Sequence, residues 1–193
     1  KGKGIYLSLI LRPHMGLLEV PQITLMAAVA LAQAVQQATG LKSQIKWPND
    51  ILVGRKKIAG ILTELNAELN QVNYCVVGIG INVNISQTQL PEQATSLAQA
   101  LGNKVNRVEL ARTLLKQLDY TYQELIDSGL APILEAWRSF ADFLGSRIQV
   151  DVQGKTVEGQ AVDLDETGAL LVRTDTGLIE SISAGDVLLT RSS

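Results

Sequence analysis

The sequence contains one cysteine, one histidine and only 4% aromatic residues. A single cysteine excludes an internal disulfide framework, and Cys75 lies in the apolar run YCVVGIGI, which favours a small buried thiol over a nucleophile. His14 has no second histidine with which to form a metal site, so we predict a loop residue. This sparing use of cysteine fits a reducing, cytoplasmic location.

An excess of positive charge is also missing. The chain has 17 basic and 19 acidic residues and a net charge of -2. Binding to DNA or RNA depends largely on cations that attract phosphates, so we expect no nucleic-acid partner. No apolar run is long enough to span a bilayer without a charge or turn signal, and we expect no membrane partner. No Walker loop or Gly-x-Gly-x-x-Gly fingerprint is present, so any nucleotide is held in a less common way.

The 193 residues are 46% hydrophobic, which is enough for a core and allows one domain plus a small appendage. Periodicity and turn residues predict strands and helices in the first three quarters of the chain. Asn106 is the expected N-cap of the helix predicted at 107–128, and Gly129 is expected to end that helix. The predicted strands are 5–11, two within 45–65 around Gly54-Arg55, and 72–83; the predicted helices are 22–39, a short one late in 86–102, 107–128 and 131–143.

After Gly145 the pattern changes to short β segments separated by turns, which is typical of a small barrel. We therefore predict two domains, residues 1–144 and residues 145–193. The fold class is α/β of the α+β type: a mixed β-sheet with helices on one face, followed by a small SH3-like barrel. The expected barrel strands are 148–152, 156–164, 170–174, 178–183 and 187–190.

The strand at 72–84 has two different faces. Odd-numbered residues from Val77 to Val83 are β-branched and suit packing on helices, whereas the even-numbered face contains Gly78, Gly80 and Asn82. Two glycines in a strand interior indicate either a bulge or close packing, or a ligand that lies flat against the bared peptide. We weigh these two alternatives about equally. Asn82 could then bond a planar heterocycle through its amide.

The stretch KWPNDILVGRKKIAGILTE, residues 46–64, combines a rigid corner with paired lysines. Pro48 restricts both itself and Trp47, so Asn49 and Asp50 are reached in a defined direction. Asp50 could hold Mg²⁺ or a ribose hydroxyl. The alternative is an ordinary Asx turn.

Lys56 and Lys57 could be no more than a solvated hairpin tip, but apolar residues follow at once, which places Lys57 at the boundary between water and core. An ammonium there can neutralise a phosphate or an oxyanion. Strict alternation separates Lys57 from Gly60, so the two can meet one ligand only through the Gly60 backbone or across a bulge.

Three strings, KWPNDI at 46–51, KIAGILTE at 57–64 and GIGINVN at 78–84, together resemble the core of biotin protein ligases, in the same order. The resemblance covers essentially the whole chain and implies that ATP, Mg²⁺ and biotin form biotinyl-5′-AMP, from which biotin passes to a lysine of a carboxylase carrier domain. It implies no permanently bound cofactor. It assigns catalysis to Lys57; substrate binding to Lys57, Gly60, Ile61, Gly78, Gly80 and Trp47; the nucleotide to Asn49, Asp50 and Asn82; and Mg²⁺ to Asp50.

The chain departs from the family pattern at its start. The family's Ser/Thr-rich strand, its glutamine and its Gly-Arg-Gly-Arg-x-Gly loop precede the strand at 5–11 and are not found here, so we expect a C-terminal portion of a ligase that is inactive alone. A DNA-binding helical domain is not found either. We also expect a possible homodimer through a sheet edge. The alternatives are a noncatalytic carrier-domain or adenylate-binding module and a lipoate ligase.

Overall fold

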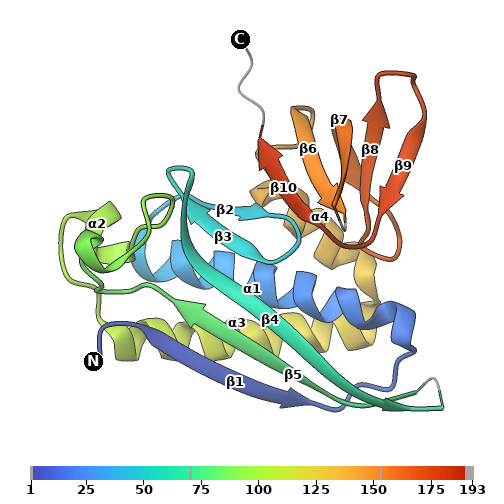
Figure 1. Cartoon of the computed structure of the whole chain (residues 1–193). Coiled ribbons are helices and arrows are strands. Elements are labelled where there is room, and N and C mark those ends of the chain that lie inside the picture. The colour runs from blue at the N-terminus through green and yellow to red at the C-terminus, as the bar shows by residue number, and fades with distance from the viewer. Residues whose placement is uncertain (1, 70, 153, 190–193) are drawn as a thin grey trace.

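The computed structural model describes residues 2–69, 71–152 and 154–189, and its first domain is built on a five-stranded sheet (Figure 1). The strand order is β1-β5-β4-β3-β2, and every ladder between neighbours is antiparallel. The predicted α+β class is confirmed, but the expected mixed sheet is corrected to an antiparallel one, since hairpins rather than helical crossovers join most neighbours. The strands are β1 (Ile5–Leu11), β2 (Ser43–Lys46), β3 (Asp50–Val53), β4 (Lys56–Glu68) and β5 (Gln71–Ile81).

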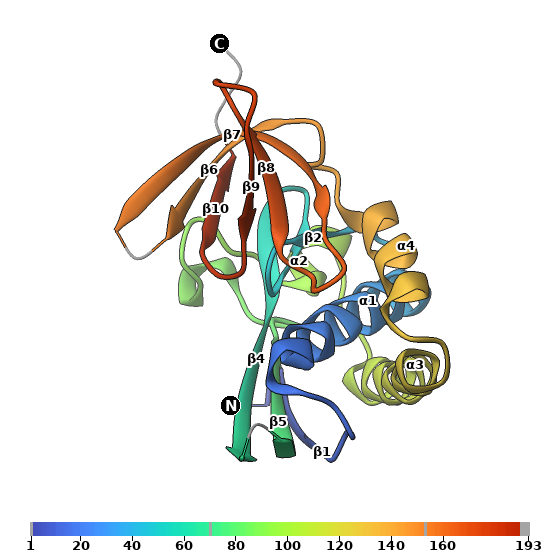
Figure 2. The ribbon, with the colours of Figure 1, turned by 90° about the vertical axis from the view of Figure 1, so that its right-hand side faces the viewer.

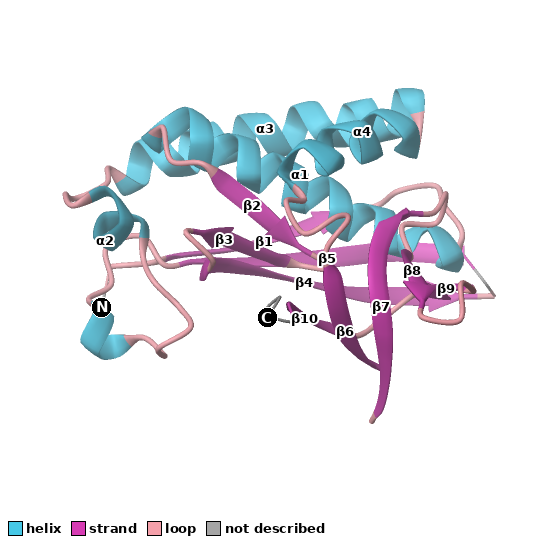
Figure 3. Cartoon of the chain, turned by 90° about the horizontal axis from the view of Figure 1, so that it is seen from above, coloured by secondary structure: helices cyan, strands magenta, loops and turns pink. Residues whose placement is uncertain are grey.

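Helices cover one face of this sheet, as expected (Figure 3). The central helix is α1 (Val20–Thr39), and Gly40 ends it with a left-handed backbone. The segment Leu17–Thr39 is long and apolar enough to cross a membrane, so the expectation that no run has this length was wrong, but 67% of its most apolar stretch is buried inside the protein. It is the core helix of this domain. The other helices are α2 (Leu97–Leu101), α3 (Arg107–Ser128), α4 (Leu130–Phe140) and the short 3₁₀ turns η1 (Leu17–Glu19) and η2 (Gln87–Gln89).

Two predictions about the helices are confirmed. The Asn106 side chain accepts hydrogen bonds from the Val108 and Glu109 backbone amides at the start of α3. The helix expected at 131–143 was also expected to pack through Trp137, and Trp137 is a fully buried core residue that packs edge-on against Phe143 at a centroid distance of 5.9 Å. Helix α4 ends at Phe140, three residues before the expected end, because Ala141 leaves the helical conformation.

The alternation of β5 divides the sheet into a packed face and an open face. Val77, Ile79 and Ile81 are buried against the helices, and Gly78 and Gly80 lie on the other face. On that open face Tyr6 is 82% exposed. Cys75 is buried as predicted, and burial raises the pKa of its thiol.

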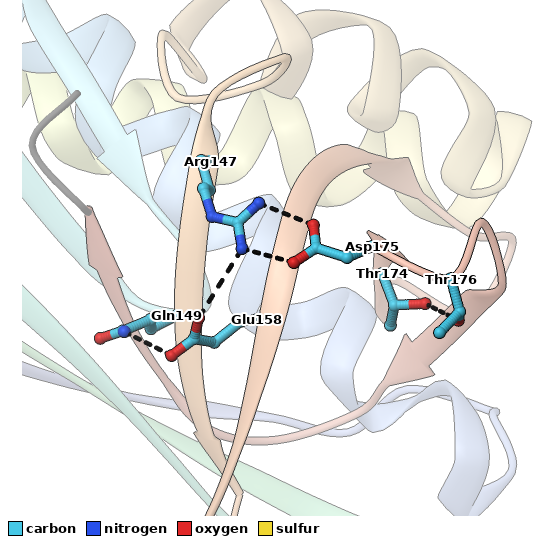
Figure 4. Close-up of polar contacts among 6 residues, drawn as sticks. All are labelled: Arg147, Gln149, Glu158, Thr174, Asp175 and Thr176. Atoms are coloured by element: carbon cyan, nitrogen blue, oxygen red, sulfur yellow. Dashed lines mark hydrogen bonds and ion pairs between the residues drawn. The ribbon is translucent and has the colours of Figure 1, made fainter. Parts of the chain in front are cut away.

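Residues 147–189 form a second antiparallel sheet in the order β10-β6-β7-β8-β9, close to the strands expected for the small barrel; this part is called the C-terminal domain below. On its outer surface Arg147 binds both Asp175 carboxylate oxygens at 2.7 Å and also approaches Glu158, which accepts a hydrogen bond from Gln149 (Figure 4). This network joins β6 and β7 to the β8–β9 turn. The strands are β6 (Arg147–Val152), β7 (Lys155–Leu164), β8 (Leu170–Thr174), β9 (Ile179–Ile182) and β10 (Asp186–Leu189); the expected residue 190 lies outside the described part.

The turn at residues 165–169, between β7 and β8, packs against the first domain near α1 and β2 (Figure 2). The buried Trp47 indole donates a 3.2 Å hydrogen bond to the Gly168 carbonyl oxygen. Asp165 shapes this turn by accepting hydrogen bonds from the Thr167 and Ala169 amides and from two hydroxyls, one of them that of Ser181. Burial opposes ionisation of Asp165, but these bonds outweigh it and lower its pKa. The turn therefore couples the two domains at the Trp47 corner.

We expect Gly168→Ala to lower the free energy of unfolding by about 2 to 3 kcal/mol, since it combines backbone strain with overpacking. Gly168 has φ +88°, and an added Cβ would lie 2.5 Å from the Leu25 Cδ1 atom. Gly177→Ala is the matched control, because Gly177 has φ +84° with nothing within 4 Å. The control should lose only about 1 kcal/mol in urea unfolding. Equal losses in both variants would show that the turn is not tightly seated.

Candidate active site

Strand register places five residues in one row across the open face of the first sheet. Tyr6 pairs with Gly80, Gly80 with Gly60, Gly60 with Asp50, and Asp50 with Lys46. Directly paired residues project to the same face, so this row, called the Tyr6–Lys46 row below, is one continuous surface. Its middle is bare backbone, and its charged groups gather at the β3–β2 end.

A cavity of about 490 Å³ lies over this row and the neighbouring one. It brings together seven of the nine residues expected at the site, and excludes Trp47 and Asn82 from its lining. Sequence reasoning missed Tyr6 and Ser8: the alternation of β1 places both on its outward face, but only the pairing of β1 with β5 brings them to the site. The lining consists of Tyr6, Leu7, Ser8, Asn49, Asp50, Lys57, Gly60, Ile61, Leu62, Gly78, Ile79 and Gly80.

Lys57 and Asp50 form an ion pair beside Gly60, with 2.6 Å between Lys57 Nζ and Asp50 Oδ1. The β3–β4 register shifts between Ile51 and Leu52, so Lys57 and Gly60 reach the same face across an irregularity of the kind the sequence required. The Lys57 backbone is also fixed from the other side: its N–H donates to Gln93 and its carbonyl oxygen accepts from Thr95. An otherwise flexible cation is therefore held in one place.

Gly60 also makes room for the Lys57 side chain, which the sequence did not predict. An added Cβ would lie 3.2 Å from both Cε and Nζ of Lys57 and 3.5 Å from Asp50 Oδ1. The space above Gly60 is thus a seat for the lysine side chain, whereas an added Cβ at Gly78 or Gly80 would make only ordinary van der Waals contacts. A glycine at position 60 lets the ammonium lie low over the sheet.

We expect Gly60→Ala to shift the Lys57 ammonium by a few tenths of an ångström and to weaken binding of a phosphate-containing ligand about two- to fivefold, because an added Cβ 3.2 Å from Nζ is closer than most such contacts. Lys57→Met is the background for the control, since it removes the ammonium that the added Cβ would meet. Titration with a biotinyl-AMP analogue measures the effect. An equal loss of affinity from Gly60→Ala with and without Lys57→Met would contradict a seat for Lys57.

The contacts of Trp47 and Asn49, at the corner before β3, mainly stabilise the fold. The Asn49 amide donates to the Ile61 carbonyl oxygen at 2.8 Å, and the Ile61 N–H donates back to the Asn49 carbonyl oxygen at 3.0 Å. The Ile61 side chain is buried in the core, so its contribution to the cavity is small. Trp47 is 2% exposed and engaged with Gly168. A substrate contact by Trp47 is therefore not favoured by this geometry, because packing has already used both ring and N–H.

Asn82 lies just beyond β5, next to the cavity but outside its lining. Its backbone N–H donates to Ile58, and its carbonyl oxygen accepts from Leu97. Its proposed contact with adenine stays a prediction. The similar Asn84 has a structural part, since its amide oxygen and nitrogen bond the N–H and carbonyl of Val105. His14 is an exposed loop residue, as predicted.

The site can neutralise an anion but offers little to a bare metal ion. Within residues 2–69, 71–152 and 154–189, no group of three or more His, Cys, Asp or Glu could hold a metal. Asp50 offers one carboxylate, already shared with Lys57. That fits a magnesium ion held mostly by nucleotide phosphates and water. The bared peptide of Gly78 and Gly80 beside a fixed cation suits a flat ligand that carries a phosphate.

Known families match both domains of the chain. Residues 1–82 match the Biotin/lipoate A/B protein ligase family, and residues 143–189 match the Biotin protein ligase C terminal domain, which is SH3-like. A biotin protein ligase from Aquifex aeolicus, solved in complex with biotin and ATP, superposes with a TM-score of 0.83 at 29% identity, covering 98% of this chain and 79% of that one.

Two curated relatives extend the comparison. The bifunctional ligase/repressor BirA of Bacillus subtilis is 40% identical over 98% of this chain, which spans 59% of that protein. The biotin–[acetyl-CoA-carboxylase] ligase of Paracoccus denitrificans is 33% identical over 88% of this chain and 74% of its own length. Sequence, fold and domain order agree, and the chain belongs to the biotin protein ligase family.

Proposed function

We propose that the chain forms the sheet floor of a biotin protein ligase site, where ATP and biotin yield biotinyl-5′-AMP and biotin then passes to a lysine of a carboxylase carrier domain. The observation that carries this proposal is the Lys57–Asp50 pair seated over Gly60, beside the open backbone of Gly78 and Gly80. Family membership and the Aquifex aeolicus complex with biotin and ATP support it.

In the proposed first step, a carboxylate oxygen of biotin attacks the α-phosphorus of ATP, and the bond to pyrophosphate breaks. Lys57 lies where its ammonium can neutralise both the carboxylate and the phosphate, which otherwise repel each other. In the second step, the acceptor amine attacks the acyl carbon, and AMP leaves with the bonding electrons. Lys57 then offsets the charge that grows on the departing phosphate.

Gly78 and Gly80 provide a flat surface on which the bound molecule can approach the sheet closely. Asp50 keeps the ammonium in position before the ligand enters, and it is the carboxylate that would meet a magnesium ion bound to ATP. Magnesium supplies further neutralisation of the phosphates. No permanently bound cofactor is part of the proposal.

The chain spans only 59% of the Bacillus subtilis relative, so the activity and partners of a whole protein are proposals. The carrier domain, the homodimer through a sheet edge and the cytoplasmic location all stay predictions. The expected absence of a nucleic-acid partner concerns these 193 residues alone. It does not extend to the relatives, because that relative is named a ligase and repressor.

The test is a hybrid in which residues 1–193 replace the matching part of the Paracoccus denitrificans ligase. We expect the hybrid to release pyrophosphate only when biotin is present, and to biotinylate a carrier domain. Lipoate in place of biotin distinguishes the lipoate ligase alternative. A folded hybrid that binds biotinyl-AMP without making it would favour the noncatalytic module instead.

A further inference from the structure

Lys46 stands at the charged end of the Tyr6–Lys46 row, outside the cavity lining, and no role has been given to it so far. It pairs directly with Asp50, so both side chains project to the open face of the sheet. It is the last residue of β2, and the next residue, Trp47, is buried and bonded to Gly168. The backbone that carries the Lys46 ammonium is therefore fixed at the junction of the two domains.

The present partner of Lys46 comes from the C-terminal domain. Its Nζ lies 2.7 Å from Asp186 Oδ1, and the two side chains differ greatly in exposure: 21% for Lys46 and 71% for Asp186. Asp186 also lies directly opposite Asp151 on the neighbouring strand. An exposed carboxylate regains its hydration easily on release, and such ion pairs contribute little free energy. Asp186 is thus the partner that a stronger anion would displace.

Charge is distributed unevenly along the row. The Tyr6–Gly80 end carries no charge, whereas Lys57, Asp50 and Lys46 follow one another toward β2. Asp50 already neutralises much of the positive charge of Lys57, so Lys57 alone leaves most of the negative charge of a triphosphate unbalanced. The next cation in line along the row is Lys46.

We propose that Lys46 is a further phosphate-binding residue, which leaves Asp186 to bind the pyrophosphate end of ATP. The assignment of that end to ATP rests on the proposed function, whereas the binding of inorganic pyrophosphate can be measured by itself. In the empty protein Asp186 holds the ammonium of Lys46. When pyrophosphate is bound, the ammonium contacts phosphate oxygens and Asp186 faces water.

The experiment is calorimetric titration of the 193-residue chain with inorganic pyrophosphate at constant ionic strength. Lys46→Met keeps the aliphatic stem and removes the charge, and should weaken binding about tenfold, as expected for one charge-assisted contact. Asp186→Asn removes the competitor and should tighten binding about two- to fivefold. Asp151→Asn is the matched control, with the same change of charge on the paired strand, and should have less than half of that effect. AMP, which lacks the pyrophosphate, should bind equally to the wild type and Lys46→Met.

The proposal is supported if Lys46→Met weakens pyrophosphate binding and Asp186→Asn strengthens it. A purely structural ion pair would instead respond to the loss of either partner with a change of affinity in the same direction. Changes of the same sign, no change in either variant, or no binding of pyrophosphate by the wild-type chain would overturn it. Circular dichroism melts show whether each variant is folded. If the two variants change pyrophosphate affinity in opposite directions but the hybrid ligase is inactive, the proposed function is refuted and Lys46 is still a pyrophosphate-binding residue.

Discussion

Lys57→Ala is expected to lower the rate of biotinyl-5′-AMP formation at least ~100-fold in the hybrid ligase, the size of effect expected when one charge-stabilising donor is lost. Lys57 is the only cation that lines the cavity within the described part of the chain, and its ammonium is held at 2.6 Å from Asp50. Because the side chain is half exposed rather than in the core, the fold should be retained. Pyrophosphate release under saturating ATP and biotin measures the rate.

Lys56→Ala is the natural control for this change. Lys56 is the neighbouring residue, it is exposed, and it lies outside the cavity lining. Its loss should change the rate less than twofold. If Lys57→Ala forms biotinyl-AMP at a nearly wild-type rate, Lys57 has no part in the chemistry and the proposed mechanism fails.

The second large effect is expected at Gly80. Gly80→Val places a branched side chain where the flat ligand should lie, so affinity for a biotinyl-AMP analogue should fall at least about tenfold. The unfolding free energy should change by less than about 1 kcal/mol, since valine suits a strand. An added Cβ would meet only the Tyr6 ring, at 3.6 and 3.7 Å, which is ordinary contact.

Thermal melts and ligand titration separate these two quantities. Glu64→Val is the matched control, because Glu64 is an exposed residue of the neighbouring strand on the same face but outside the cavity. It should leave ligand affinity unchanged. A Gly80→Val protein that unfolds easily, while its folded fraction binds normally, would show that Gly80 serves packing.

Local rules were sufficient for most of the secondary structure. The alternation of Ile5–Leu11, the glycine after Thr39 and the cap at Asn106 depend on neighbours in the chain, and the observed elements follow them. The three hairpins of the first sheet already imply antiparallel neighbours, because a short turn reverses the chain. The pairing of β1 with β5 was not predictable in this way, since these strands are far apart in the sequence and become neighbours only through packing of the whole domain.

In the candidate site, too, some features follow from the local sequence and others only from the tertiary structure. By itself, the sequence determined the residue types: a lysine at the boundary between water and core, a carboxylate after a rigid corner, and a strand with one glycine face. Only the tertiary structure decided that Tyr6 and Ser8 join the site and that Trp47 faces the C-terminal domain. It also decided that the Lys57 side chain lies over Gly60, because a side chain's neighbours across a sheet follow from register and bulges that no local pattern records.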